Sequence, residues 1–111
     1  MVKFTGKAKR GGVKIVVGSH TWVPYAETGY AYFRELELLR DAGLSTMEII
    51  SAATMENARF FRVEDRLGSI EKGKLADLVL VKGNPLEDIQ VLRDPEKVML
   101  NGVFVKRMVS K

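Results

Sequence analysis

Residues 67–81 (Leu-Gly-Ser-Ile-Glu-Lys-Gly-Lys-Leu-Ala-Asp-Leu-Val-Leu-Val) are the stretch that decides the fold. Gly68 and Gly73 punctuate its first half, and its second half ends in residues 78–81, which are apolar at every position. A short, unbroken apolar run of this kind is typical of a β-strand that is covered on both faces. The stretch therefore marks the change from helical to β structure along the chain.

The sequence after this strand predicts a β-hairpin. Asn101 and Gly102 lie between two short apolar runs, and this pair is a strong hairpin signal because both turn residues need positive φ. One helical turn is expected at residues 86–91, in the connection between the strands. We therefore expect residues 63–111 to form a small β segment.

The part of the chain ahead of the β segment predicts two or three helices. Apolar residues recur at helical spacing over residues 30–42, and a glycine then stops the helix. Ser45 and Glu48 have the spacing of a capping box at the start of the next helix. Thr54 is a second candidate N-cap, so we expect the helical run to break there and restart over residues 55–61.

Residues 13–18 (Val-Lys-Ile-Val-Val-Gly) predict a buried strand, because β-branched residues dominate the run and a glycine ends it. A short helix over residues 2–10 precedes it, and we group residues 1–62 as one strand-loop-helices segment. The strand has no neighbouring strand close in sequence, although a fully apolar strand needs partners on both edges. This inventory indicates a fragment or an oligomer.

Length and composition exclude several classes of protein. The chain has 111 residues, 46% hydrophobic and 29% charged, which is ordinary for a globular protein and unlike a disordered one. No apolar run approaches the roughly 18 residues needed to cross a bilayer, so we expect no membrane partner. The first residues lack the apolar core of a signal peptide, and the absence of cysteine excludes disulfides and thiolate metal sites. A cytoplasmic location is the resulting expectation.

The net charge of +4 raises the question of nucleic-acid binding. Five of the first fourteen residues are basic, but no aromatic residues are interleaved in a way that would stack bases. Solvated lysines around a short helix are the simpler interpretation. We therefore do not expect nucleic acid to be a partner.

Several stretches in a fixed order carry a resemblance to a known family. The most specific is residues 67–81, and the others are residues 12–19, 35–39, 42–45, 52–54, 57–58, 84–86 and 101–102. Their order and spacing resemble the C-terminal end of the metal-dependent amidohydrolase superfamily, closest to its imidazolonepropionase-like and Xaa-Pro dipeptidase-like members. The resemblance covers residues 12–106.

The resemblance implies an α/β fold: the last strand and helices of a (β/α)8 amidohydrolase barrel, followed by the C-terminal part of its small β domain. Residues 13–18 would be the last barrel strand, residues 30–61 the helices after it, and residues 67–107 the returning strands of the small β domain. Barrel chemistry lies at the C-terminal ends of the strands. In this chain that place is residues 18–21.

The resemblance makes His20 the candidate catalytic residue. The family normally ends this strand in Gly-Ser/Thr-Asp, and the aspartate touches the metal and takes a proton from the attacking water. His20 stands in the aspartate's place, and imidazole can bind a metal or act as a base near neutral pH. It is the only histidine, whereas a hydrolytic metal site usually takes three or more protein ligands. We therefore assign no metal ligand and no cofactor to this chain alone; the complete family enzyme uses zinc or another divalent metal.

Each candidate in the loop after residue 18 has a simpler alternative. His20 is either a group in a site that another polypeptide completes, or a loop histidine at a vestigial position. Trp22 and Tyr25 are candidates for a substrate-contacting wall, as in the loops that follow barrel strands, or they cover the core at the end of the strand.

Acidic residues outside this loop are expected to be structural. Asp77 lies in a motif-like run, but a turn or capping role is the better interpretation. On the helix of residues 30–42, we expect Glu37 to be solvated and Glu35 to pair with Arg34 or Arg40.

Three functional hypotheses remain open. The first is a truncated amidohydrolase that acts on C–N bonds in cyclic amides or dipeptides and is inactive alone. Its partner would be a missing N-terminal barrel polypeptide. The second is a non-catalytic module that forms a homo-oligomer through unpaired strand edges and an apolar helix face. The third, which rests only on charge, is a basic nucleic-acid-binding protein.

Overall fold

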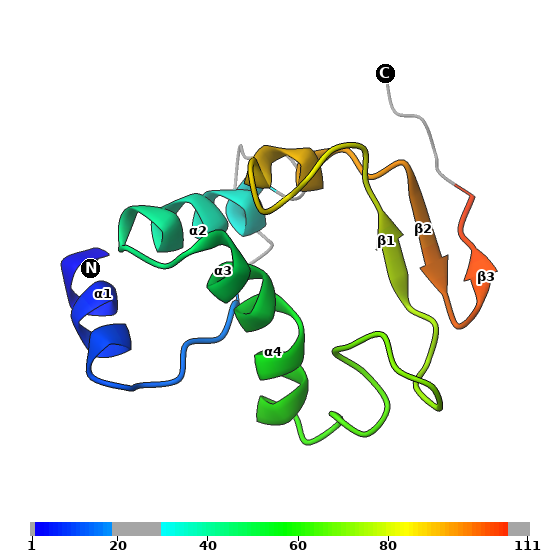
Figure 1. Ribbon diagram of the computed structural model, residues 1–111, viewed down its shortest axis with the longest axis horizontal. Helices are drawn as coiled ribbons and strands as arrows, with labels where there is room; N and C mark the ends of the chain where they lie inside the picture. The colour runs from blue at the N-terminus through cyan, green and yellow to red at the C-terminus, as the bar shows by residue number, and fades with distance from the viewer. Residues whose placement is uncertain (1, 19–29, 107–111) are drawn as a thin grey trace.

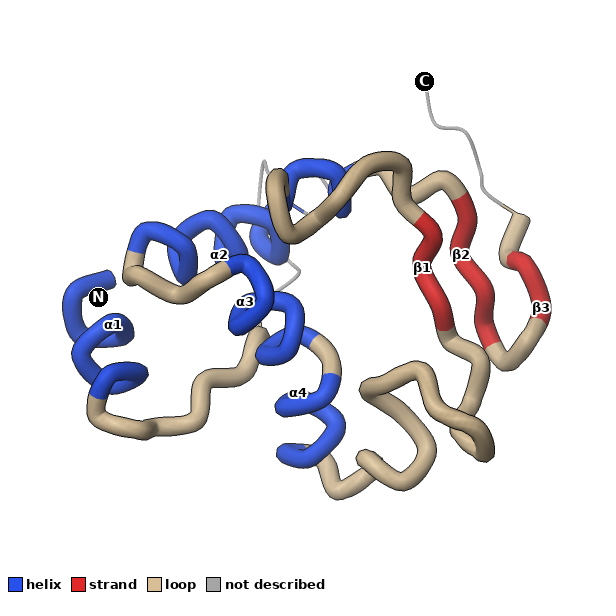
Figure 2. The backbone as a smooth tube through the Cα atoms, in the orientation of Figure 1, coloured by secondary structure: helices blue, strands red, loops and turns tan. Residues whose placement is uncertain are grey.

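The computed structural model describes residues 2–18 and 30–106 (Figure 1). Helices gather at one end of this part of the chain, and a three-stranded sheet lies at the other (Figure 2). Not one helix among these residues combines the length and hydropathy that a membrane span requires. In chain order the elements are α1 (Val2–Arg10), α2 (Tyr30–Asp41), α3 (Thr46–Ala53), α4 (Met55–Phe60), β1 (Leu78–Leu80), the 3₁₀ helix η1 (Ile89–Arg93), β2 (Lys97–Leu100) and β3 (Val103–Phe104).

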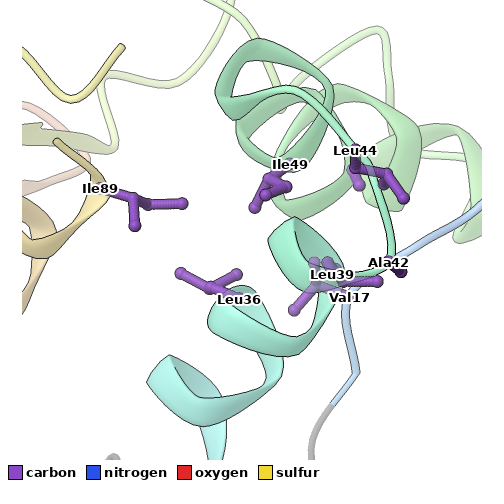
Figure 3. Packing of buried hydrophobic residues seen from close by; sticks show 8 residues of the cluster. Val17, Leu36, Leu39, Ala42, Leu44, Ile49 and Ile89 are labelled. Carbon is purple, nitrogen blue, oxygen red and sulfur yellow. The ribbon is translucent and has the colours of Figure 1, made fainter. Parts of the chain in front are cut away.

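The buried core lies between α2, α3 and the extended residues 13–18 (Figure 3). Leu36 of α2 and Ile49 of α3 are its two largest fully buried side chains, and Ile89 of η1 joins the same cluster. Its members are Val17, Leu36, Leu39, Ala42, Leu44, Ile49, Ala52 and Ile89. No residue of β1, β2 or β3 belongs to this cluster, so the core fixes the helices and residues 13–18 rather than the sheet.

The helix boundaries follow the local signals in the sequence. The predicted capping box is confirmed, since the Glu48 N–H donates to Ser45 Oγ at 3.2 Å and the Ser45 N–H donates to Glu48 Oε2 at 2.8 Å. The break at Thr54 is also confirmed, but its predicted mechanism is wrong. The Thr54 hydroxyl donates to the Ile50 carbonyl at 2.8 Å and caps no N–H of α4. The Thr54 side chain therefore donates a hydrogen bond to a backbone carbonyl in the last turn of α3 rather than accepting one from an N–H of α4.

The predicted buried strand over residues 13–18 is extended backbone that pairs with no strand among the described residues. Only Val17 is buried, and Val13 is 54% exposed. A strand needs neighbours for its backbone hydrogen bonds, and the described strands all belong to the sheet at the other end of the molecule. The segment is held instead by the helices that pack against its last two residues.

The predicted hairpin is confirmed. β2 and β3 pair antiparallel with Leu100 opposite Val103, so Asn101 and Gly102 alone form the turn. Both have positive φ, 50° for Asn101 and 81° for Gly102, as a two-residue hairpin turn requires. β1 adds to the other edge of β2, which gives the sheet order β1-β2-β3.

Two expectations about the β segment need correction. The expected cover on both faces of residues 78–81 is absent from the described chain: Val79 is 60% and Leu80 53% exposed, because the sheet has no second layer there. The helical turn expected at residues 86–91 is η1, which begins at Ile89. Its start is set by Asp88, whose side chain accepts the Gln90 N–H at 3.0 Å.

Candidate active site

The residues that the sequence singled out as site candidates, His20, Trp22 and Tyr25, lie outside the described residues. The structure does describe the segment that leads to them, ending at Gly18, and the helix that follows them, α2. The geometry of the candidate site is therefore built from the end of residues 13–18 and the helices around it.

Three helices hold the end of this segment. The Val17 N–H donates to the Ala52 carbonyl of α3 at 3.2 Å. The Gly18 N–H donates to Glu35 Oε1 of α2 at 3.1 Å, and Asn57 Nδ2 of α4 donates to the Val17 carbonyl at 2.9 Å. The last two bonds join residues 17 and 40 positions apart, so the tertiary fold fixes this end of the segment although no strand pairs with it in the described chain.

Glu35 was expected to pair with an arginine, and this expectation is wrong. Arg34 instead donates to Glu37 at 2.9 Å, because residues three apart meet on a helix surface, and Glu35 faces Gly18. Its other oxygen, Oε2, is buried and has no hydrogen-bond partner in the structure. Burial, and after it the negative charge of Glu35, raises the pKa of Tyr32 on the same helix.

Glu37 is not a solvated residue, as was expected, but a contact between α2 and η1. Its Oε1 accepts from Gln90 Nε2 at 3.0 Å, its Oε2 accepts from Arg34, and Arg93 lies 4.0 Å away. The hydrogen bond from Gln90, and after it that from Arg34, lowers the pKa of Glu37. The Arg93 guanidinium also lies 5.6 Å from the Phe33 ring centroid. No local sequence pattern predicts this contact, because Gln90 is 53 residues from Glu37.

Asp77 has the structural role that the sequence predicts. Its Oδ1 accepts the Asn101 N–H at 2.7 Å, and the Gly102 N–H donates to the neighbouring Ala76 carbonyl at 3.0 Å. Asp77 therefore ties the hairpin turn to the start of β1 and belongs to the sheet rather than to the end of residues 13–18.

The described side chains do not fit a metal centre by themselves. Among residues 2–18 and 30–106, no group of three or more His, Asp or Glu side chains is placed to hold a metal ion. The single histidine of the chain lies outside these residues. A site of the kind that the family resemblance implies needs ligands beyond those described here.

The basic residues near the N-terminus are partly paired. Lys9 lies 3.8 Å from Glu48, and Lys14 lies 3.9 Å from Glu56. Exposed pairs of this kind contribute little to stability. They do reduce the positive charge that this end of the chain could offer to a nucleic acid.

Comparison with known proteins identifies relatives over nearly the whole chain. The model of the "Amidohydrolase family" matches residues 6–105. A crystal structure of a Xaa-Pro dipeptidase with methionine bound in the active site is 42% identical, with a TM-score of 0.84 over 96% of this chain and 25% of that chain. A putative prolidase from Bifidobacterium longum is 40% identical, with a TM-score of 0.88 over 96% of this chain and 26% of that one. Adenine deaminase 4 of Rhizobium meliloti (strain 1021) is 35% identical over 65 residues, which are 59% of this chain and 10% of that protein.

These matches confirm the fold class and the resemblance. The chain is an α/β segment that spans about a quarter of the length of the solved relatives, 25% and 26%, and its architecture is consistent with part of a (β/α)8 barrel. The family match covers both the helical part and the sheet, so it does not rest on one motif. The chain belongs to the amidohydrolase family.

Proposed function

We propose that this chain is the C-terminal part of a metal-dependent hydrolase of C–N bonds in dipeptides or cyclic amides, and that it is inactive by itself. One observation carries the proposal: identities of 42% and 40% extend over 96% of this chain but over only about a quarter of each solved relative. The named activity of the first relative is that of a Xaa-Pro dipeptidase. Dipeptides ending in proline are therefore the first substrate class to test.

The chemistry of the residues supports dependence on another part of the enzyme. A hydrolytic metal site usually takes three or more protein ligands, and the chain has one histidine and no cysteine. In this proposal His20, in the place of the family's aspartate, is the proton-transfer group that the chain contributes. Trp22 and Tyr25, in the same loop, contact the substrate. Zinc or another divalent metal and its remaining ligands come with the N-terminal barrel polypeptide.

The proposal assigns different tasks to the two parts of the chain. Residues 1–62 complete the barrel end and carry His20, and residues 63–111 complete the small β domain. The buried core supports this division in that its members, apart from Ile89 of η1, come from residues 17–52 and none comes from the sheet.

A chimera tests the proposal. Residues 6–105 of this chain replace the matching C-terminal part of the Bifidobacterium longum putative prolidase, and Xaa-Pro dipeptide hydrolysis is measured with added Zn²⁺ or Mn²⁺. We expect no hydrolysis by the isolated chain and measurable hydrolysis by the chimera. Hydrolysis by the isolated chain at the rate of the chimera contradicts the claim of dependence. A folded, metal-loaded chimera that cleaves neither dipeptides nor cyclic amides contradicts the proposed activity.

Substitutions of His20 within the same chimera test its role. His20→Asp restores the family's residue, and we expect it to raise kcat, while His20→Ala lowers kcat by roughly 10²-fold, the usual contribution of a proton-transfer group. Equal kcat values for the unsubstituted and His20→Ala chimeras would show that His20 is vestigial.

A second candidate function is a self-associating module, and the exposed sheet favours it. Leu80, Val79 and Phe104 are 53%, 60% and 58% exposed, so apolar side chains face solvent on the described sheet. Exposed apolar surface and open strand edges tend to be covered by another copy. The mass of the isolated chain in solution tests this candidate.

Nucleic-acid binding is the third candidate. Retention of the chain on DNA that falls steeply as the salt concentration rises would support it.

A further inference from the structure

The peptide group between Val17 and Gly18 is held on both sides by side chains. Its carbonyl oxygen accepts from Asn57 Nδ2 at 2.9 Å, and its N–H donates to Glu35 Oε1 at 3.1 Å. Glu35 belongs to α2 and Asn57 to α4. The two bonds therefore reach one peptide group from two different helices.

A peptide group is planar, and its C=O and N–H point in opposite directions. A bond to either one alone leaves the plane free to rotate about the axis of that bond. Bonds to both hold the group at two points and restrict this rotation, and with it the direction in which the chain leaves Gly18. The Val17 N–H donates to the Ala52 carbonyl at 3.2 Å, which holds the preceding peptide through one of its two polar groups.

Stability alone does not explain a glutamate at position 35. Glu35 directly precedes the fully buried Leu36 in α2, and it reaches Gly18 beside the buried Val17. Its Oε2 is buried without a hydrogen-bond partner in the structure, and an unpaired buried acceptor costs free energy that an apolar side chain would avoid. What Glu35 provides, and an apolar side chain could not, is the acceptor for the Gly18 N–H.

We propose that Glu35 and Asn57 are positioning residues that clamp the Val17–Gly18 peptide and so set the direction of the chain into residue 19. The clamp acts through the backbone and touches no substrate. Its consequence for catalysis rests on the proposed function, in which the residues after Gly18 enter the active site. The clamp itself is a property of this chain and is measurable without a substrate.

Amide hydrogen exchange of the full chain, measured residue by residue by NMR, tests the clamp. In the unsubstituted chain we expect the Gly18 amide to be protected. Glu35→Ala removes the acceptor and speeds exchange at Gly18 by roughly tenfold, the equivalent of one net hydrogen bond. Glu35→Gln keeps an oxygen at the same place, so it restores most of the protection. Asp41→Ala is the control, since it removes an exposed carboxylate from the far end of the same helix.

The Ile49 amide separates a local effect from general unfolding. Ile49 is fully buried, and its N–H donates to the Ser45 carbonyl at 3.0 Å. The clamp predicts faster exchange at Gly18 with unchanged exchange at Ile49. An equal acceleration at both amides means that Glu35 only stabilises the fold, and this overturns the proposal. An unprotected Gly18 amide in the unsubstituted chain overturns it too.

A double substitution tests whether the two side chains act as one device. Asn57→Ala removes the donor to the Val17 carbonyl, and we expect it alone to speed exchange at Gly18. If both bonds hold one plane, losing either releases it, so the Glu35→Ala, Asn57→Ala double variant exchanges about as fast as the faster single variant. Effects that multiply in the double variant show two independent contacts and overturn the paired clamp. Failure of the proposed function appears elsewhere, in the hydrolysis assay of the chimera.

Discussion

The individual side chains show where sequence reasoning succeeds and where it fails. Ser45 and Glu48 were paired correctly because their partners are each other, three residues apart. Glu35 and Glu37 were assigned wrongly because their partners, Gly18 and Gln90, lie 17 and 53 residues away. Asp77 is intermediate: its turn role was predicted, but its partner 24 residues later was not. Distant partners were therefore missed, and local ones were found only in part, because the Arg34–Glu37 pair and the Thr54–Ile50 bond are local and were not predicted.

Glu37 gives a prediction about acid stability. Hydrogen bonds from Gln90 and Arg34 hold its pKa below the ordinary value, so the unfolded chain takes up a proton at a higher pH than the folded chain does. The stabilisation is fully present above the unfolded pKa and is lost as pH falls through the depressed folded pKa. As the pH falls through and below the ordinary glutamate pKa of 4.5, we therefore expect the free energy of unfolding to decrease less for the Glu37→Gln variant than for the unsubstituted chain.

Urea unfolding at several pH values measures this difference. Glu64→Gln is the control, because Glu64 is an exposed carboxylate in the turn after α4. Glu48 and Glu71 also have lowered pKa values and contribute to the slope in every variant. The same pH slope for the Glu37→Gln variant and the unsubstituted chain would contradict the role assigned to Glu37.

At the scale of elements, glycine decides how closely α1 approaches the end of α2. Gly6 is buried, and a Cβ atom at this position would overlap the carbonyl oxygen of Ala42. The sequence predicted a short helix over residues 2–10, which is α1, but it gave no sign that Gly6 is the contact point. From the sequence alone, a glycine inside a helix is expected only to destabilise it. The reason for the glycine becomes visible when the structure shows the backbone of Ala42 against it.

Gly6→Ala is expected to undock α1. The overlap with a backbone oxygen cannot be relieved by a rotamer change, so we expect a loss of about 1–3 kcal/mol in the free energy of unfolding, the usual cost of overpacking. The higher helix propensity of alanine offsets part of that loss. Gly11→Ala is the matched control, because its Cβ meets its nearest atom, the Ala8 carbonyl oxygen, at an ordinary 3.4 Å. Chemical denaturation compares the two, and equal effects would refute this account of Gly6.

At the scale of the whole molecule, the order of elements was predictable but their surroundings were not. The helices, the break at Thr54 and the Asn101–Gly102 hairpin follow from local signals. The strand expected at residues 13–18 and the covered strand expected at residues 78–81 both require neighbours that the described chain does not supply. In the proposed function these neighbours come from the rest of an amidohydrolase chain; this chain spans 25% and 26% of the solved relatives.

The sheet therefore predicts how the isolated chain behaves in solution. Leu80 and Phe104 line the same groove of about 300 Å³, on the face where Leu78 and Met99 are paired in register. Covering exposed apolar area yields roughly 25 cal/mol per Å², so we expect the isolated chain to self-associate at tens of micromolar through this face. Leu80→Lys with Phe104→Lys shifts the equilibrium to monomer, because association would then bury two unpaired charges.

Sedimentation equilibrium measures the mass in solution of the unsubstituted chain and of each variant. Comparing substitutions on the sheet with one on the helices shows which surface makes the contact. Phe60→Lys is the matched control, since it removes an exposed aromatic ring (67% for Phe60, 58% for Phe104) from α4 on the helical side. A chain that sediments as a folded monomer would show that the sheet face is stable in water without a partner. A Phe60→Lys variant that dissociates as fully as the double variant would place the contact on the helices. In the chimera, the proposed function buries the same sheet face within one molecule. Leu80→Lys with Phe104→Lys should then lower the melting temperature of the chimera.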